Sequence, residues 1–190
     1  MTKLVQAERV ETWSRSMLSK LNIPEPEVNT IAKTLTAANL RGVDTHGVIM
    51  LRVYMRRFSK ISMGPISIVS ETNNAVVIDG GDRPGMSVAN FAMDKAIEKA
   101  KTNTAGIVSA RNSNHFGICS YYALKAAEQG MIGIVMTSAG KRLAPWGGLE
   151  NIWGNCRRSH PPEAQSFWIW QILWWHSRRS SSTPGRVSPA

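Results

Sequence analysis

Residues 106–117, GIVSARNSNHFG, decide how this chain is expected to fold. The first part is a short apolar run rich in β-branched residues, which predicts a strand. Beyond the polar part, apolar residues over 121–127 recur at the spacing of a helix that ends near Gly130. The polar loop between them lies where ligands bind in open α/β sheets, because helix N-terminal amides converge there. His115 can also serve only to tie this loop together, and the residue type alone leaves both readings open.

Three amphipathic helices are predicted ahead of this region. Apolar residues at helical spacing place the first up to about Leu21, the second over residues 24–41 and the third over residues 48–58. The other face of the third helix is basic and is typical of solvated surface, because no aromatic residues interleave with its charges. These charges belong to Arg52, Arg56, Arg57 and Lys60.

Strands alternate with helices after Gly64. Residues 66–69 and 75–79 have the alternation of two paired strands, and Ser87 is placed to cap the helix that follows. Residues 131–136 predict a further buried strand. This order predicts an α/β fold with a largely parallel or mixed sheet that is covered by helices.

Composition limits the classes of protein to which the chain can belong. Its net charge of +10 is produced in part by residues 156–190, where five arginines stand against one acidic residue. Cys119 and Cys156 give neither a disulfide framework nor paired zinc spacing, so we expect a reducing, cytoplasmic location and no metal site. No secretory signal is visible at the start, and the dense apolar run at 167–175 is too short to span a bilayer.

Four motifs resemble those of the malate/L-lactate dehydrogenase family, which includes the ureidoglycolate dehydrogenases. They are LRGVDTHGV at 40–48, NSNHFG at 112–117, GMIG at 130–133 and APWGG at 144–148. The motifs stand in the family's order and at family-like separations, which makes the set far more specific than any one motif. The resemblance covers residues 1–155, roughly the first half of a family member.

The resemblance implies a fold and a reaction. It implies an N-terminal helical region over residues 1–64 and a partial mixed-sheet domain over residues 65–155 that binds NAD or NADP. The family binds this dinucleotide without a conventional Rossmann fingerprint, and no GxGxxG occurs in this sequence. Its members interconvert a small 2-hydroxy acid of the malate, lactate or ureidoglycolate type and the 2-oxo acid, usually as homodimers.

Site residues are implied by the same resemblance. His46 would be the acid/base, because an imidazole with a pKa near neutrality can accept the hydroxyl proton and return it. Thr45 would fix its ring, and His115 would be the second catalytic residue, in contact with substrate or nicotinamide. Substrate contacts are also expected from Thr45, Arg52 and Lys141. The expected cofactor contacts are Asn114, Phe116, Gly117, Ile118, Pro145 and Gly147.

The first motif departs from the family at one position. Many members carry an arginine four residues after the motif's histidine, where it can clamp the substrate carboxylate, and here that residue is Met50. Arg52 is the nearest arginine, but on a helix it lies about 200° away from Met50 and does not simply replace the clamp. The sequence therefore leaves the identity of the hydroxy acid open.

The chain changes character after Cys156. Residues 156–190 contain no lysine or aspartate, but seven serines and four tryptophans. Reading the possible codons of residues 167–176 one nucleotide earlier gives Leu-Asp-(Leu/Met)-Ala-(Asn/Asp)-x-(Val/Leu/Met)-Val-Ala, which resembles what the family carries at about this point. We therefore expect a frameshift between residues 155 and 167, a truncated family domain and a disordered tail over 156–190. The other reading is a genuine tryptophan-rich tail that binds a partner, and resequencing the DNA separates the two.

Two other functions are weighed against the dehydrogenase. The tail's basic side chains could bind nucleic acid or a membrane surface, which steep salt-dependent retention on DNA would show. Alternatively, the chain is a non-functional product whose incomplete sheet exposes apolar area and an unpaired edge. The motifs favour the dehydrogenase, with a small hydroxy or oxo acid as its ligand and with neither nucleic acid nor membrane as a partner. The basic side chains in question are Arg157, Arg158, Arg178, Arg179 and Arg186.

Overall fold

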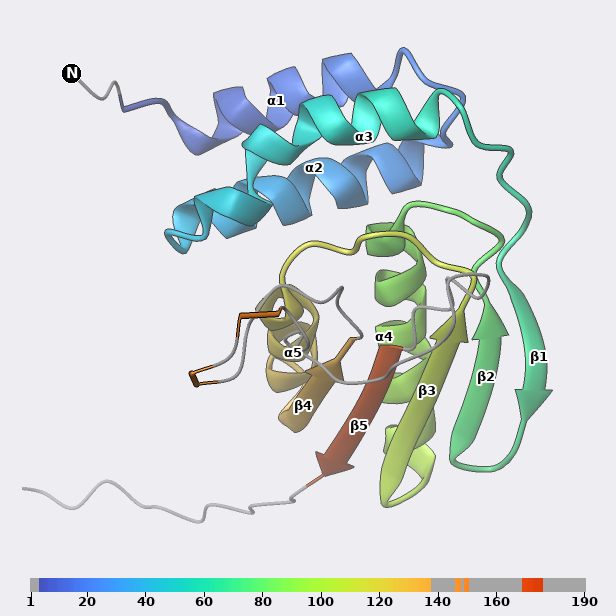
Figure 1. The fold of residues 1–190 in the computed structure, drawn as a ribbon. Coiled ribbons are helices and arrows are strands. Elements are labelled where there is room, and N and C mark those ends of the chain that lie inside the picture. The colour runs from blue at the N-terminus through green and yellow to red at the C-terminus, as the bar shows by residue number, and fades with distance from the viewer. Residues whose placement is uncertain (1–3, 138–145, 148, 151–168, 176–190) are drawn as a thin grey trace, which may run out of the picture.

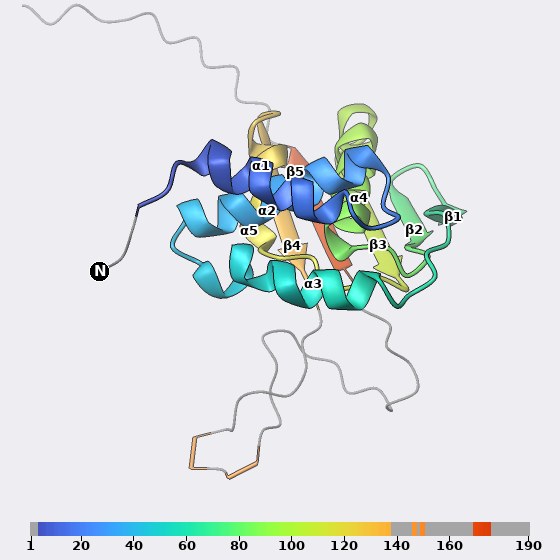
Figure 2. The same cartoon turned by 90° about the horizontal axis from the view of Figure 1, so that it is seen from above.

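The computed structural model describes residues 4–137, 146–147 and 149–150 and, for the backbone alone, residues 169–175. Three helices form one layer, and a sheet backed by two further helices forms the rest (Figure 1). The layer consists of α1 (Ala7–Leu18), α2 (Glu25–Leu40) and α3 (Leu51–Phe58), and the helices on the sheet are α4 (Gly85–Thr102) and α5 (Cys119–Ala127). Seen from above, the three-helix layer lies across the edge of the sheet (Figure 2).

The sheet is mixed, as the sequence predicts. Its strands are β1 (Ser67–Glu71), β2 (Ala75–Asp79), β3 (Ala105–Arg111), β4 (Met131–Met136) and β5 (Ile169–Trp175), in the order β1-β2-β3-β5-β4. Strands β2 and β3 are parallel, whereas β1 is antiparallel to β2 and β5 is antiparallel to both β3 and β4. Strands β2 and β3 both end at the edge that faces the three-helix layer (Figure 1). The predicted pairing of the first two strands is confirmed.

The apolar side chains form two clusters. One lies between the sheet and the helices α4 and α5, and it includes Ile78, Met93 and Val108. The other lies within the three-helix layer around Leu35 and also takes in Met86 from α4. Burying these faces is what makes short amphipathic helices stable, since isolated helices of this length are marginal in water. Met86 links the two layers at the edge where β2 and β3 end.

Three helix predictions need correction. The first helix ends at Leu18 rather than Leu21, and the third begins with a 3-10 turn, η2 (Val48–Met50), before α3. Ser87 does not cap α4, because that helix already begins at Gly85 after Pro84. Proline suits the start of a helix for two reasons: its φ is fixed near the helical value, and the backbone N–H that it lacks has no intrahelical partner there. The Ser87 side chain is instead buried in the first turn.

The predicted tail is described at one segment only. Residues 169–175 form strand β5, with Ile172 opposite both Ile107 of β3 and Ile134 of β4. The apolar and aromatic composition of this segment suits a strand, and the expectation of a disordered tail over 156–190 stays a prediction. The rest of the tail, with its arginines and the expected frameshift, lies outside the described residues. The division at residues 64 and 155 stays a prediction.

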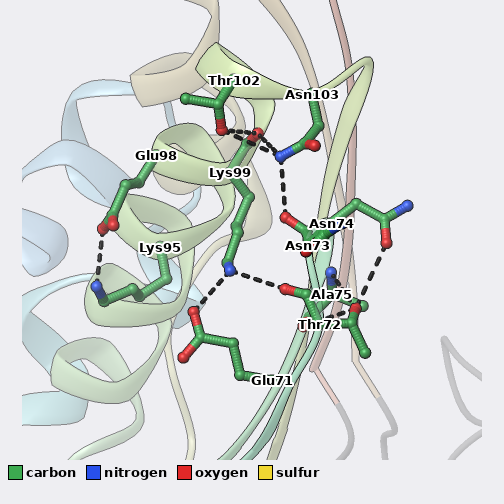
Figure 3. Close-up of polar contacts among 10 residues, drawn as sticks. All are labelled: Glu71, Thr72, Asn73, Asn74, Ala75, Lys95, Glu98, Lys99, Thr102 and Asn103. Carbon is green, nitrogen blue, oxygen red and sulfur yellow. Dashed lines mark hydrogen bonds and ion pairs between the residues drawn. The ribbon is translucent and has the colours of Figure 1, made fainter.

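A polar cluster joins α4 to the β1–β2 turn at the amino end of β3 (Figure 3). The Lys99 ammonium lies 2.6 Å from the Glu71 carboxylate and donates to the Thr72 carbonyl at 2.8 Å. The Asn103 amide donates to the Asn73 carbonyl at 2.9 Å. We call this group the hairpin cluster. It fastens the hairpin to the end of α4.

Candidate active site

The loop that follows β3 is held from both layers by Asn114, whose exposed fraction is 4%. Its amide nitrogen donates to the carbonyls of Asp82 and Arg83 at 2.7 and 3.0 Å. Its amide oxygen accepts from the guanidinium of Arg57 on α3. The side chain of Asn114 is therefore occupied by the protein and fixes the position of the neighbouring His115.

The loop also rests directly on the first residue of α4. A Cβ atom at Gly85 would lie 2.0 Å from the Asn114 carbonyl oxygen and 2.6 Å from the His115 carbonyl carbon. Both contacts are far closer than real Cβ contacts, so only glycine lets the backbone approach this closely. The start of α4 and the His115 loop thus form one packed unit.

His46, the other histidine of the site, is held by contacts from the end of α2. The Asn39 amide donates to the Asp44 carboxylate and accepts from the Val48 N–H at 2.8 Å. A Cβ at Gly47 would come within 2.3 Å of the Asn39 side chain, so a larger residue there would force Asn39 to move from these hydrogen bonds. These contacts fix the 3-10 turn η1 (Asp44–His46), which presents the half-buried His46.

The two loops bring the imidazoles of His46 and His115 together. Their ring centroids lie 5.3 Å apart and the planes are inclined by 27°, which is a stacked arrangement. The Thr45 hydroxyl lies 3.0 Å from Nδ1 of His46, as expected for the residue that fixes this ring. On the other side, the Tyr54 hydroxyl from α3 lies 2.6 Å from Nδ1 of His115. The sequence prediction that the two histidines share one site agrees with this geometry.

The surroundings favour neutral side chains at this site. Burial raises the pKa of Tyr54 above its ordinary value, so its phenol keeps its proton. His115 retains exposed surface, but desolvation of its ring and, second, the nearby His46 lower its pKa from 6.5 to about 4. Near neutral pH the His115 ring is therefore uncharged.

The three residues that follow His115 lead into α5. Phe116 is buried and its ring stacks on that of Tyr122, with centroids 5.4 Å apart. Gly117 has a φ of +81° and donates its N–H towards Nδ1 of His115 at 3.4 Å. Ile118 is the buried residue before α5. These three residues, from which cofactor contacts are expected, connect His115 to the start of α5.

Among the described residues, neither Arg52 nor Gly147 has a recorded hydrogen bond or ring contact with the imidazoles. Arg52 is exposed on α3, and Met50 packs against the apolar cluster of the helical layer. Gly147 lies in a turn with a φ of +74°. Lys141 and Pro145 lie outside the described residues. Their roles stay predictions.

Sequence reasoning missed the residues that support the site. Arg57 was assigned to a solvated face, although it reaches across to the loop after β3. Tyr54 is 1% exposed, and a buried tyrosine hydroxyl needs a hydrogen-bond partner. That rule could have marked Tyr54, but it could not have named His115, which is 61 residues away in the sequence.

The fold and the site define a class of protein: an α/β protein with a paired-imidazole site where polar loops meet at the carboxyl ends of parallel strands. Within the described residues, no three His, Cys, Asp or Glu side chains are grouped to hold a metal ion. No helix in that part of the chain has the length and apolarity to cross a membrane.

Comparison with known proteins places the chain within this class. Residues 5–156 match the family described as malate/L-lactate dehydrogenase, and the chain belongs to that family. It is 42% identical over 153 residues to malate dehydrogenase from Pyrococcus horikoshii, covering 79% of this chain and 42% of the relative. The solved structure of that enzyme superposes with a TM-score of 0.75, covering 79% of this chain and 44% of the other.

Relatives with other names show how the family varies. L-sulfolactate dehydrogenase from Methanocaldococcus jannaschii is 38% identical over 141 residues, covering 73% of this chain and 41% of the relative. Ureidoglycolate dehydrogenase (NAD(+)) from Escherichia coli is 27% identical over 153 residues, covering 79% and 44%. The chain thus spans less than half the length of the curated relatives it matches.

Proposed function

We propose that the site belongs to an oxidoreductase that transfers hydride between NAD or NADP and a small 2-hydroxy acid. One observation carries the proposal: two family motifs that are far apart in the sequence place His46 and His115 in ring contact. Membership of the family supports the reaction class. The names of the relatives support malate, sulfolactate or ureidoglycolate as substrates to be tested, and the family description adds lactate.

The backbone that leads from His115 into α5 fits a nicotinamide cofactor. A bound nicotinamide supplies the hydride acceptor. Phe116, Gly117 and Ile118 are the residues that would hold it, because their backbone leads into the start of α5, where free helix N-terminal amides can bind an anionic group. Pro145 and Gly147 are proposed to add contacts from the last motif. The choice between NAD and NADP is left to the assay.

The proposed mechanism divides the work among residues of this chain. His46 accepts the proton of the substrate hydroxyl as hydride departs and returns it in the reverse reaction. Thr45 holds the His46 ring through Nδ1. His115 contacts the reacting oxygen from the loop that follows β3. Arg52 and Lys141 are proposed as further substrate contacts, and neither is a simple substitute for the arginine that is absent at position 50.

We also propose that the complete protein is a cytoplasmic homodimer that takes a hydroxy or oxo acid as its small-molecule partner. The cytoplasmic location rests on two cysteines without a disulfide framework. The dimer rests on the family resemblance. Light scattering on the purified protein tests the dimer directly.

The test compares two proteins: the 190-residue chain and a version in which the family reading frame is restored after residue 155. Each is titrated with NADH and NADPH by fluorescence and assayed with the four hydroxy acids. We expect saturable binding of one nucleotide and turnover of one acid by the frame-restored version. Absence of both in both proteins would overturn the proposal. Saturable retention on DNA at physiological salt would favour the nucleic-acid function instead.

A further inference from the structure

We propose that Tyr54 is a positioning residue that holds His115 in the tautomer with its proton on Nε2, so that His115 acts as a hydrogen-bond donor. The part of this inference that concerns catalysis rests on the proposed function. The tautomer itself does not.

Two groups approach the same nitrogen of His115. The Tyr54 hydroxyl lies 2.6 Å from Nδ1, and the Gly117 backbone nitrogen lies 3.4 Å from it. A hydroxyl can donate or accept, so Tyr54 alone leaves the tautomer open. A backbone N–H can only donate. The Gly117 contact is the longer one, but it decides the direction: Nδ1 is the acceptor, and the proton of the neutral ring lies on Nε2.

The opposite tautomer leaves groups without partners. A proton on Nδ1 would face the Gly117 N–H, donor against donor. Tyr54 would then have to accept, and its own hydroxyl proton would lack this partner at a residue that is 1% exposed. A buried donor without an acceptor loses its hydration with no compensation. The observed contacts therefore favour one tautomer.

The charged form of the ring is disfavoured by the same contacts. It too would carry a proton on Nδ1, and it would place a positive charge 5.3 Å from the centroid of His46. The lowered pKa of His115, about 4, agrees with this arrangement. The ring thus keeps a single proton, on the nitrogen that neither Tyr54 nor Gly117 occupies.

The two histidines then have different tasks in the proposed reaction. His46 takes the hydroxyl proton, and the electron pair of the breaking C–H bond leaves with the hydride. His115 donates Nε2–H to the same oxygen and keeps its proton throughout. A neutral donor of this kind stabilises negative charge on the oxygen without competing for the proton.

Nitrogen-15 NMR of the imidazoles tests the tautomer without substrate or cofactor. The full 190-residue chain is labelled at its four histidines, and His115→Gln identifies the His115 signals. We expect a protonated Nε2 and an unprotonated Nδ1 from pH 6 to pH 8. A protonated Nδ1 of His115 in this range would overturn the inference.

Tyr54→Phe tests the positioning role. The variant keeps the ring that stacks on Phe58 at 5.5 Å and removes only the hydroxyl. We expect the Nδ1 signal of His115 to move and the two tautomers to mix. The matched control is Tyr121→Phe, which removes a hydroxyl from α5 and should leave the His115 signals unchanged. If both variants give the wild-type spectrum of His115, Tyr54 does not position the ring.

Kinetics of the frame-restored protein separate the two proposals. Tyr54→Phe should lower kcat roughly 10- to 100-fold, by analogy with residues that orient metal-binding imidazoles, with a smaller change in KM. The expected tautomer in a protein without hydride transfer would refute the proposed function and leave the tautomer standing. Full turnover with the other tautomer would do the reverse.

Discussion

The two ends of β3 carry polar clusters that look alike in composition but differ in what they leave unpaired. In the hairpin cluster, Lys99 is matched by Glu71 and by a carbonyl, and Asn103 by a second carbonyl. At the other end, Asn114 and Asn39 are matched in the same way. The imidazoles that they support have partners recorded at Nδ1 but none at Nε2 within the described residues.

This difference separates the hairpin cluster, which only joins two elements, from the candidate active site. At the hairpin cluster, the Lys99 ammonium and the Asn103 amide are paired with a carboxylate and with backbone carbonyls, and these contacts join α4 to the hairpin. At the carboxyl end, satisfied amides hold titratable rings whose Nε2 has no recorded partner among the described residues. Reactive atoms therefore become available where the supporting residues, rather than the reactive ones, absorb the local hydrogen bonds.

The largest contrast is expected in catalysis. In the frame-restored protein, His46→Ala should lower turnover roughly 10²- to 10⁴-fold, because a general base contributes about that much. Lys99→Met, at the hairpin cluster, should leave turnover within about twofold. Steady-state rates with the preferred acid measure both. Wild-type turnover in His46→Ala would remove its assigned role.

A smaller contrast is expected when a Cβ atom is added to the packed glycine at the start of α4. Gly85→Ala should destabilise the protein by about 2–3 kcal/mol, because the new atom would meet backbone rather than a movable side chain. Gly130→Ala is the control: the φ of Gly130 is +73°, but a Cβ added there would meet no other part of the described structure within 4 Å. The control should cost only about 1 kcal/mol of backbone strain. Urea unfolding measures both, and equal losses would contradict the close approach.

The same substitution at both clusters sharpens the comparison further. Asn114→Ala removes a buried amide and its three part-buried hydrogen bonds, to the Asp82 and Arg83 carbonyls and from the Arg57 guanidinium. We expect a loss of about 1–3 kcal/mol. Asn103→Ala, where the hydrogen bonds are more exposed, should cost under about 1 kcal/mol. If Asn103→Ala costs more, burial is not what distinguishes the clusters.

Most of the fold and the meeting of the two histidines could be predicted from the sequence. Local periodicity gave the order of the elements, and the motifs named His46 and His115. The supporting contacts could not be predicted, because Arg57 and Asn114 are joined by tertiary packing over 57 positions of sequence. The start of α4 was misplaced for a related reason: Ser87 has the preference of a cap, but Pro84 and the close packing of Gly85 fix the start earlier.

The smallest contrast is expected in the pH dependence of stability, because the two clusters titrate in different windows. The pKa of His115 is about 4 in the folded chain and near 6.5 when unfolded, so the unfolded state binds more protons between these values. Stability from this residue is complete above about pH 6.5 and is lost as the pH falls towards 4. At the hairpin cluster, the hydrogen bond from Lys99 lowers the pKa of Glu71, so its contribution is present above about pH 4.5 and is lost only below.

His115→Gln separates these windows. It should flatten the free energy of unfolding between pH 6.5 and pH 4.5 and leave the loss below pH 4.5 in place. Glu71→Gln should do the opposite. Urea midpoints at half-unit steps of pH measure both slopes, and a slope between pH 6.5 and pH 4.5 that survives in His115→Gln would mean that another group carries it. Because His115 keeps exposed surface, solvent screens its interactions and the slope should be shallower than its lowered pKa alone would imply.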